Sequence, residues 1–311
     1  MDNQAPIVPE TPASIPHGSA WQDITGYGLS VFALMKPRIV LELLVTAFCA
    51  MVVARAGLPG VERIVLTLVG LGLSAGGANA VNMWYDRDID GIMTRTQNRP
   101  VPAGRLPAEG ALGFGIAMQV VSFLLLWLRV DHLAAVLSLA GFVYYVFLYT
   151  MLLKRRTPQN IVIGGGAGAF PPLVGWAAVT GHLGAAPLLM FLIIFLWTPP
   201  HFWALALYRE GDYRRARIPM MPVVRGARST KLQSLGYTVA LAVASLLLFW
   251  TGRVGVVYLV VALVLGLGFI ATELVLLRER EPATRMAKAT FRYSLLYLTA
   301  LFGAMVLNVR P

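Results

Sequence analysis

Acidic side chains gather at one point of this chain, in the stretch NMWYDRDID at residues 82–90, although only 13% of all residues are charged. On a helix that continues through residue 90, Asn82, Asp86 and Asp90 share one face, whereas Asp88 points elsewhere. Oxygen ligands on one face suit Mg²⁺, which takes one or two carboxylates and shares its other positions with water and phosphate. We therefore expect Asn82, Asp86 and Asp90 to be metal ligands.

A basic loop, RPVPAGRL at residues 99–106, follows these acids and is stiffened by two prolines and a glycine. Arg99 and Arg105 can bind phosphate oxygens, because a guanidinium group makes paired hydrogen bonds to them. A metal-binding face beside a rigid basic loop indicates a diphosphate ligand. The alternative is a solvated acidic helix end, neutralised by Arg87 and Arg95, with a loop that is basic for reasons of membrane topology alone.

A second stretch of the same design, WTPPHFWALALYREGDYRRARIPMMP, occupies residues 197–222. If its helix runs on without a break, His201, Tyr208 and Asp212 lie within about 20° of one another on one face. Arg209 and further arginines follow, and then a proline-stiffened loop. The two stretches thus predict two helices that each present oxygen ligands and an arginine-rich loop on the same side of the protein.

The elements that carry these stretches are long apolar runs. Apolar residues make up 57% of the 311-residue chain and its mean hydropathy is +0.68, which is typical of a polytopic helical membrane protein and not of a soluble domain. The net charge of +11 lies mainly in short loops, which favours membrane topology and lipid headgroups over nucleic acid. The predicted spans are 33–54, 64–85, 110–129, 132–153, 161–180, 186–208, 232–251, 254–277 and 290–309.

The basic residues also predict an orientation. Of the 26 Lys and Arg residues, 21 lie on the side that carries both acidic stretches and 5 on the other. By the positive-inside rule, the N-terminus and the site loops are cytoplasmic and the C-terminus is external. Lys154 and Arg155, in the connection after the fourth span, lie on the cytoplasmic side, where they can reach a diphosphate or serve topology alone. We expect residues 1–30 to be a disordered cytoplasmic tail and residues 31–311 to be one transmembrane domain.

The nine apolar runs predict an all-α integral membrane fold. The repeated acidic design, four spans apart, predicts two four-helix halves and a ninth helix around a central site. Two more acids, Glu42 and Glu273, lie within spans near their cytoplasmic ends. Acids at membrane depth are candidate functional groups. Either can instead pair with a nearby arginine, Arg38 or Arg278, so their role stays open.

Several of these stretches together resemble the UbiA superfamily of intramembrane prenyltransferases, and within it the branch that acts on haem. The stretches are KPRIVLELLVT (36–46), NMWYDRDIDGIMTRTQNRPVPAGRL (82–106), KRRTPQNIVIGG (154–165) and TPPHFWALALYREGDYRRARIPMMPVV (198–224). The resemblance implies that Mg²⁺ on the two acidic helices holds farnesyl diphosphate, whose ionisation gives an allylic cation. It implies the vinyl group of protohaem IX (haem b) as acceptor, water as the source of a hydroxyl group, and haem O as product.

The resemblance also implies a place for the protein: the bacterial inner (plasma) membrane, where haem O serves terminal oxidases, with haem A synthase or oxidase assembly factors as partners. This chain departs from the wider superfamily at one position. Many relatives carry two aspartates four residues apart on the sixth span, whereas here Tyr208 stands four before Asp212. The second half of the site would then hold one Mg²⁺ through Asp212, with Arg209 binding the diphosphate, and the number of metal ions stays open.

His201 is the one histidine of four that lies deep in a predicted span. It can ligate haem iron through a neutral imidazole or position water at the cation. The alternative is a buried histidine bonded to a backbone carbonyl that Pro199–Pro200 leaves free. The aromatic residues Trp84, Tyr85, Tyr144 and Tyr145 can stabilise a carbocation or form an interfacial belt.

Three other functions fit parts of the pattern. A prenyltransferase with a phenol or quinone acceptor would share the aspartate chemistry but not the haem-branch stretches. A CDP-alcohol phosphotransferase would need a DG…AR run before its acids, which AGGANAVNMWYD (75–86) lacks. A transporter would place polar groups near the bilayer midplane, where this chain has little beyond His201.

Overall fold

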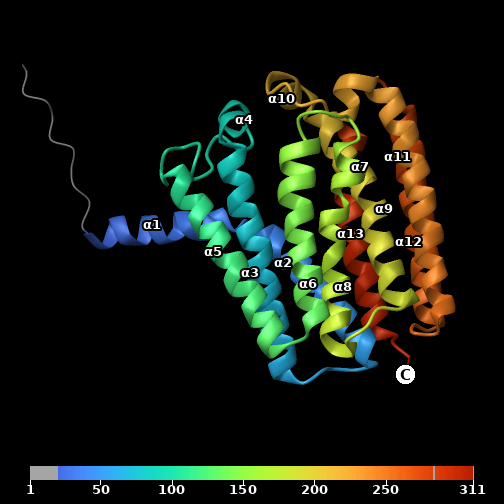
Figure 1. The fold of residues 1–311 in the computed structure, drawn as a ribbon. Coiled ribbons are helices and arrows are strands. Elements are labelled where there is room, and N and C mark those ends of the chain that lie inside the picture. The colour runs from blue at the N-terminus through green and yellow to red at the C-terminus, as the bar shows by residue number, and fades with distance from the viewer. Residues whose placement is uncertain (1–19, 283, 311) are drawn as a thin grey trace, which may run out of the picture.

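Long apolar helices form the described part of the protein. The computed structural model describes residues 20–282 and 284–310, and within these ranges nine helices are long and apolar enough to cross a membrane, which confirms the predicted fold class (Figure 1). They are α2 (Pro37–Arg55), α3 (Val61–Tyr85), α5 (Ala108–Arg129), α6 (His132–Val143) continued by the π-helix η1 (Tyr144–Leu153), α7 (Asn160–Gly164) continued by α8 (Gly166–Thr180), α9 (Ala185–Tyr208), α11 (Met221–Leu247) continued by the 3₁₀-helix η2 (Leu248–Thr251), α12 (Val256–Arg278) and α13 (Arg285–Leu307).

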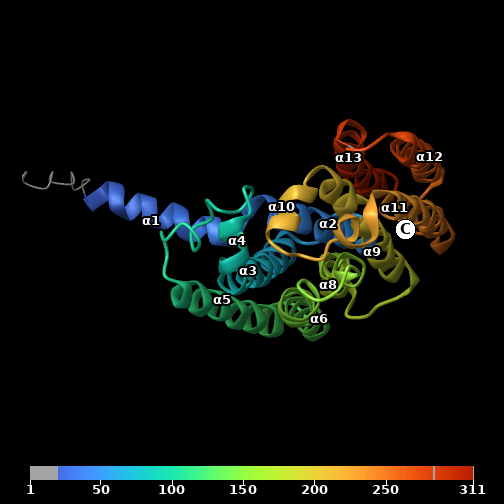
Figure 2. The ribbon, with the colours of Figure 1, turned by 90° about the horizontal axis from the view of Figure 1, so that it is seen from above.

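Three further helices lie outside the spans. The short helices α4 (Arg87–Ile92) and α10 (Glu210–Arg215) lie at the same end of the bundle (Figure 1). Helix α1 (Ala20–Leu34) projects sideways from the bundle in both views (Figures 1 and 2). The tail prediction for residues 1–19 falls outside the described residues, and from Ala20 onward the predicted tail is helical.

The outer faces of the bundle are apolar. Leu263, Val264 and Leu267 on α12 are exposed, as are Val120 and Leu124 on α5. In a soluble domain such side chains would be covered, whereas in a bilayer they contact lipid tails. Together with the nine spans, this surface identifies a multi-pass membrane protein.

Close approach between α3 and α5 fixes the helix that carries the first acidic stretch. A Cβ atom on Gly77 would lie 2.6 Å from the carbonyl oxygen of Gly115, and one on Gly115 would lie 2.7 Å from the carbonyl oxygen of Gly77. Only glycine permits this contact on both helices, which is the way small residues act in membrane helix packing. The position of α3 is therefore set by backbone contact rather than by long side chains.

An apolar cluster holds the two acidic segments together. Ile89 and Met93, at α4, belong to one buried cluster with Trp203 of α9, Tyr213 of α10 and Ile218 beyond it. Burial of such side chains contributes about 1.5–3 kcal/mol each. The cluster thus packs α4 against α9 and α10 and sets the spacing between the two halves of the site.

Candidate active site

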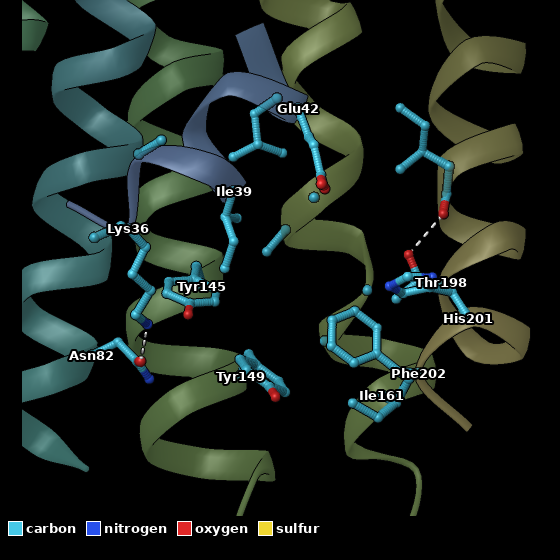
Figure 3. Close-up of a pocket in the computed structure, with 18 of the residues that line it drawn as sticks. Lys36, Ile39, Glu42, Asn82, Tyr145, Tyr149, Ile161, Thr198, His201 and Phe202 are labelled. Carbon is cyan, nitrogen blue, oxygen red and sulfur yellow. Dashed lines mark hydrogen bonds between the residues drawn. The ribbon is translucent and has the colours of Figure 1, made fainter. Parts of the chain in front are cut away.

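A cavity of about 410 Å³ opens between the helices near α4 and α10. Its wall is built mainly by α2, α3, α6, η1, α7, α8, α9 and α13 and by the loop that follows α4 (Figure 3). Polar side chains line the part nearest the short helices: Lys36, Asn82, Asp90, Arg95, Arg99 and Lys154. Farther along the same helices the wall is mostly apolar, for example at Leu71, Ile194 and Leu298, with Glu42 among its few polar side chains.

The first acidic stretch is buried beside this polar end. Helix α3 ends at Tyr85, yet the backbone bonds from Asp86 N to Asn82 O (2.9 Å) and from Asp90 N to Asp86 O (2.8 Å) carry the helical spacing into α4. Asn82, Asp86 and Asp90 are 2%, 0% and 1% exposed, whereas the side chain of Asp88 is 60% exposed. The three predicted ligands are therefore buried on one face of the helix and Asp88 is exposed, as their four-residue spacing predicted.

Each buried carboxylate is paired with a basic side chain. Asp86 Oδ2 accepts hydrogen bonds from Lys154 Nζ at 2.5 Å and from Asn82 Nδ2 at 2.7 Å, and Arg155 Nη2 lies 3.3 Å from Asp86 Oδ1. Arg99 Nη1 donates to Asp90 Oδ2 at 2.6 Å. These contacts offset the cost of burying two carboxylates. They also place three of the five predicted diphosphate ligands at the first acidic stretch.

Arg155 joins the buried and the exposed acids. Its two terminal nitrogens each donate to Asp88 at 2.7 Å, and its guanidinium lies 4.8 Å from the ring centre of Tyr85. The hydrogen bond from Arg155 lowers the pKa of Asp88 below its usual value. Asp88 therefore acts as an exposed anchor for Arg155.

Lys36 belongs to the site although the spacing of the acids gave no sign of it. It has a φ of 53°, in the left-handed region, directly before Pro37 starts α2, and its Nζ donates to Asn82 Oδ1 at 2.8 Å (Figure 3). A non-glycine residue in this conformation costs energy and is typical of functional sites. Burial lowers the pKa of Lys36 well below its usual value, and Arg99 and Lys154 lower it further, so a bound anion would stabilise its charged form.

The second acidic stretch differs from its prediction. The continuous helix through Asp212 is wrong: α9 ends at Tyr208, Arg209 has non-helical angles (φ −115°, ψ 17°), and α10 begins at the next residue. Asp212 is buried and accepts a hydrogen bond from Thr94 Oγ1 at 2.6 Å. Two arginines also contact Asp212. Arg215 donates to its Oδ1, and Arg209 lies 3.6 Å from its Oδ2.

The bond from Thr94 connects the two halves, because it joins the loop after α4 to α10. Asp212, Tyr208 and Arg209 are not among the residues that line the cavity. Tyr208 instead packs edge-on against Phe291, and the guanidinium of Arg209 lies over the Tyr208 ring. The structure thus brings Asp212 to the rim of the site and leaves Tyr208 behind it.

Aromatic rings enclose His201 on the cavity wall. Its imidazole stacks between Trp197, at 4.2 Å between ring centres, and Phe291, at 4.5 Å. Ser294 Oγ lies 2.7 Å from His201 Nδ1 and donates its own proton to the carbonyl oxygen of Phe291. The serine oxygen therefore accepts from Nδ1–H, which leaves Nε2 as the imidazole's free lone pair. Among the described contacts, the His201 ring makes no hydrogen bond to a backbone carbonyl, such as those that Pro199–Pro200 leave free.

Tyrosines of the π-helix η1 form another part of the wall. Tyr145 and Tyr149 stack with ring centres 5.6 Å apart, and both line the cavity (Figure 3). Of the four aromatic residues considered for cation stabilisation, Tyr145 alone lies on this wall, and Tyr149 was missed. Tyr149 stands four residues after Tyr145, a spacing that places two side chains on one face of a regular helix, so this spacing was a signal that could have found it.

In the loop after α4, one residue that was not predicted lines the cavity, and one predicted ligand does not. Arg95 lines the cavity, although the sequence suggested only that it neutralised the acids. Arg105, a predicted diphosphate ligand, instead donates to the carbonyl oxygen of Asn98 and lies off the cavity wall. Its bond closes the RPVPAGRL loop and supports Arg99.

The donor atoms present suit a magnesium diphosphate. Two buried carboxylates and one amide oxygen, on Asp86, Asp90 and Asn82, match the few protein ligands that Mg²⁺ takes when phosphate oxygens supply the rest. Among the described residues, no group of three or more His, Cys, Asp or Glu side chains could hold a metal by itself. The set therefore fits a metal ion that arrives with an anionic ligand.

Comparison with known proteins identifies relatives over most of the chain. The model of the UbiA prenyltransferase family matches residues 43–296. The chain is 57% identical to the protoheme IX farnesyltransferase of Symbiobacterium thermophilum, over 89% of this chain and 93% of that protein. It is 48% identical to the protoheme IX farnesyltransferase of Acidiphilium cryptum, over 89% of each chain.

Solved structures share the fold at low sequence identity. A structure of digeranylgeranylglyceryl phosphate synthase superposes with a TM-score of 0.75 at 16% identity, over 92% of this chain and 98% of that one. A UbiA homologue from Archaeoglobus fulgidus bound to GPP and Mg²⁺ superposes with a TM-score of 0.62 at 15% identity, over 89% and 99% of the two chains. These two likenesses establish the helical arrangement.

Proposed function

The chain belongs to the UbiA prenyltransferase family, and we propose that it transfers the farnesyl group of farnesyl diphosphate to a vinyl group of protohaem IX, giving haem O. The observation that carries this proposal is one cavity with two chemically different ends. Asp90 and basic side chains form the end near α4, with Asp86 buried beside them, and mainly apolar and aromatic side chains form the rest. A prenyl diphosphate has the same two parts.

The polar end binds the diphosphate in this proposal. Mg²⁺ held by Asn82, Asp86, Asp90 and, at the rim, Asp212 would neutralise the diphosphate and make it a better leaving group. Lys154, Arg155 and Arg99 contact the carboxylates from the loop side and are placed to bind phosphate oxygens, together with Lys36, Arg95 and, at the break between α9 and α10, Arg209. Arg105 supports the loop instead of touching the ligand.

Departure of the diphosphate transfers charge to its oxygens, and fixed cations stabilise that charge because they need no reorganisation. The allylic cation that remains needs walls without nucleophiles. Tyr145 and Tyr149 present ring faces that can stabilise it. The apolar part of the cavity, toward Leu298, accommodates the isoprenoid chain and excludes water from it.

His201 is suited to the iron of the acceptor. Its tautomer leaves Nε2 free, its ring is held between Trp197 and Phe291, and Ser294 fixes its rotation. A hydrogen bond on the far nitrogen is the usual support of an imidazole ligand. We assign His201 as the haem ligand of the site, in preference to a purely structural histidine.

The basic residues support an orientation in the bacterial plasma membrane. The end of the bundle with α4 and α10 faces the cytoplasm in our proposal, which puts the N-terminus inside and the C-terminus outside. Farnesyl diphosphate then enters from the cytoplasm. Haem A synthase or oxidase assembly factors are the partners that would take the product.

An acceptor assay tests the function. Purified protein in detergent, given farnesyl diphosphate, Mg²⁺ and haem b, is expected to yield a haem heavier by one farnesyl group and one hydroxyl group. The same protein with 4-hydroxybenzoate in place of haem b is expected to yield no prenylated phenol. Mass spectrometry of both reactions checks this. Prenylation of the phenol alone would contradict the haem assignment and favour the aromatic prenyltransferase alternative.

Asp212→Asn is expected to lower turnover by about 10-fold or more, because it removes the buried carboxylate that the second stretch offers to a cation. Glu210→Gln is the matched control: it removes one acid from the same short helix, where the Glu210 side chain is 30% exposed and pairs with Arg214. Initial rates of farnesyl transfer against Mg²⁺ concentration give the comparison. Equal rates in the two variants would remove Asp212 from the site.

A further inference from the structure

Glu42 is a carboxylate on the cavity wall that lies apart from the diphosphate site. Ile39, Glu42, Leu43 and Thr46 line the cavity from α2, at the spacing of one helical face. Figure 3 shows the side chain of Glu42 turned into the cavity, away from Lys36 and Asn82. Six residues separate it from Lys36, or about 9 Å along a helix axis. It is therefore one to two turns deeper in the membrane than the cations.

No basic or hydrogen-bonding side chain satisfies this carboxylate among the residues that the structure describes. Arg38, which the sequence offered as a partner, makes no ion pair with it in the same set of contacts. A charge or an unpaired polar group at membrane depth is costly. The exposed acceptor on the wall of a reaction cavity is thus left free for a ligand.

The reaction of the proposed function needs a base at this depth. The bond from farnesyl C1 to oxygen breaks, and its electron pair leaves with the diphosphate. The outer vinyl carbon of the haem then bonds to C1, and the positive charge passes to the inner vinyl carbon. Water adds its oxygen to that carbon, and the added water must lose a proton before the hydroxyl product is neutral.

We propose that Glu42 is the catalytic residue that binds this water and takes its proton. The proposal rests on the function assigned above. The carboxylate becomes a carboxylic acid in this step and later returns the proton to solvent. Its depth suits the step, because the charged carbon lies two bonds beyond C1, on the side of C1 away from the diphosphate. Its negative charge also stabilises the cation before water adds.

The carboxylates of the first acidic stretch and the imidazole on the cavity wall are already engaged. Asp86 and Asp90 receive hydrogen bonds from Lys154 and Arg99, and their remaining oxygens are the ones assigned to the metal. His201 uses Nδ1 toward Ser294 and, as the haem ligand, Nε2 toward iron. Glu42 is the wall carboxylate that none of these roles uses.

Glu42→Gln tests the proposal through the product and not only through the rate. Without a base, the cation loses a proton from the adjacent carbon to the departed diphosphate, and the product is an alkene lighter by one water. We expect the ratio of alkene to hydroxylated product to rise by at least about 10-fold, in line with general-base catalysis. The KM for farnesyl diphosphate should stay near that of the unmodified protein, since Glu42 lies away from the polar end.

Two variants complete the experiment. Glu42→Asp keeps a carboxylate and should restore mainly hydroxylated product. Glu273→Gln makes the same change at the other acid within a span, which is buried, is bonded to Ser234 and lies off the cavity wall, and should leave the product ratio unchanged. An unchanged ratio in Glu42→Gln overturns the proposal, as does an equal loss of both products. Absence of any haem product from the unmodified protein would instead overturn the proposed function.

Discussion

Asp86→Asn should abolish most farnesyl transfer, with turnover falling by at least about 10²-fold. Asp86 is fully buried and is the acid on which Asn82, Lys154 and Arg155 converge. Asparagine keeps the shape of the side chain but removes the charge that would hold a metal ion against the diphosphate. Losing an electrostatic contact of this kind in a closed site costs several kcal/mol in the transition state. Single-turnover rates with haem b measure the loss.

Asp88→Asn is the matched control for that result. It makes the same change two residues away, on a side chain that is 60% exposed, and leaves Asp86 in place. We expect turnover within a few-fold of the unmodified protein. Because breaking a buried ion pair also destabilises a protein, by about 3–5 kcal/mol, the folded fraction of each variant must be measured by thermal unfolding in detergent. Equal losses in folded Asp86→Asn and Asp88→Asn would contradict a specific role for Asp86.

The fold and the polar end of the site could be predicted because both depend on local pattern. Apolar runs of membrane length locate the spans, and charge asymmetry locates the loops. The spacing of Asn82, Asp86 and Asp90 separates them from Asp88, which the structure shows as a difference in burial. These features need no knowledge of how the helices pack.

The second half of the site depends on backbone irregularities that side-chain spacing does not encode. The break at Arg209 moves Asp212 onto α10 and leaves Tyr208 outside the cavity wall. The left-handed conformation of Lys36 turns its amine toward Asn82 from another helix. Each of these follows from tertiary packing, which an ideal 3.6-residue helix ignores.

The role of the ninth span could not be predicted from local sequence pattern either. Sequence spacing treated it as an addition to two four-helix halves, yet α13 supplies Phe291 and Leu298 to the cavity and Ser294 to His201. Its helix packs on α9 and α2, which closes the wall. The contribution of α13 to the cavity depends on contacts between spans that are far apart in the chain, and local sequence pattern does not predict such contacts.

Removal of divalent metal should have an effect as large as that of Asp86→Asn. Treatment with EDTA is expected to lower farnesyl transfer by at least about 10²-fold, and added Mg²⁺ should restore it. Without a cation between them, the carboxylates of Asp86 and Asp90 repel the incoming diphosphate, so equilibrium binding of farnesyl diphosphate should weaken as well. Isothermal titration with and without EDTA provides this second measurement, which does not depend on turnover.

The losses of turnover caused by Asp86→Asn and by EDTA should not multiply when the two are combined. This combination tests whether Mg²⁺ acts through Asp86. If Mg²⁺ acts through Asp86, a protein that lacks the carboxylate has little left to lose on chelation, as in a double-mutant cycle with strong coupling. EDTA should therefore reduce transfer by Asp86→Asn far less than it reduces transfer by Asp88→Asn. Lys154, freed from Asp86 in the first variant, can contact the diphosphate directly and support the residual binding. A reduction by the same factor in both variants would place the metal on other ligands.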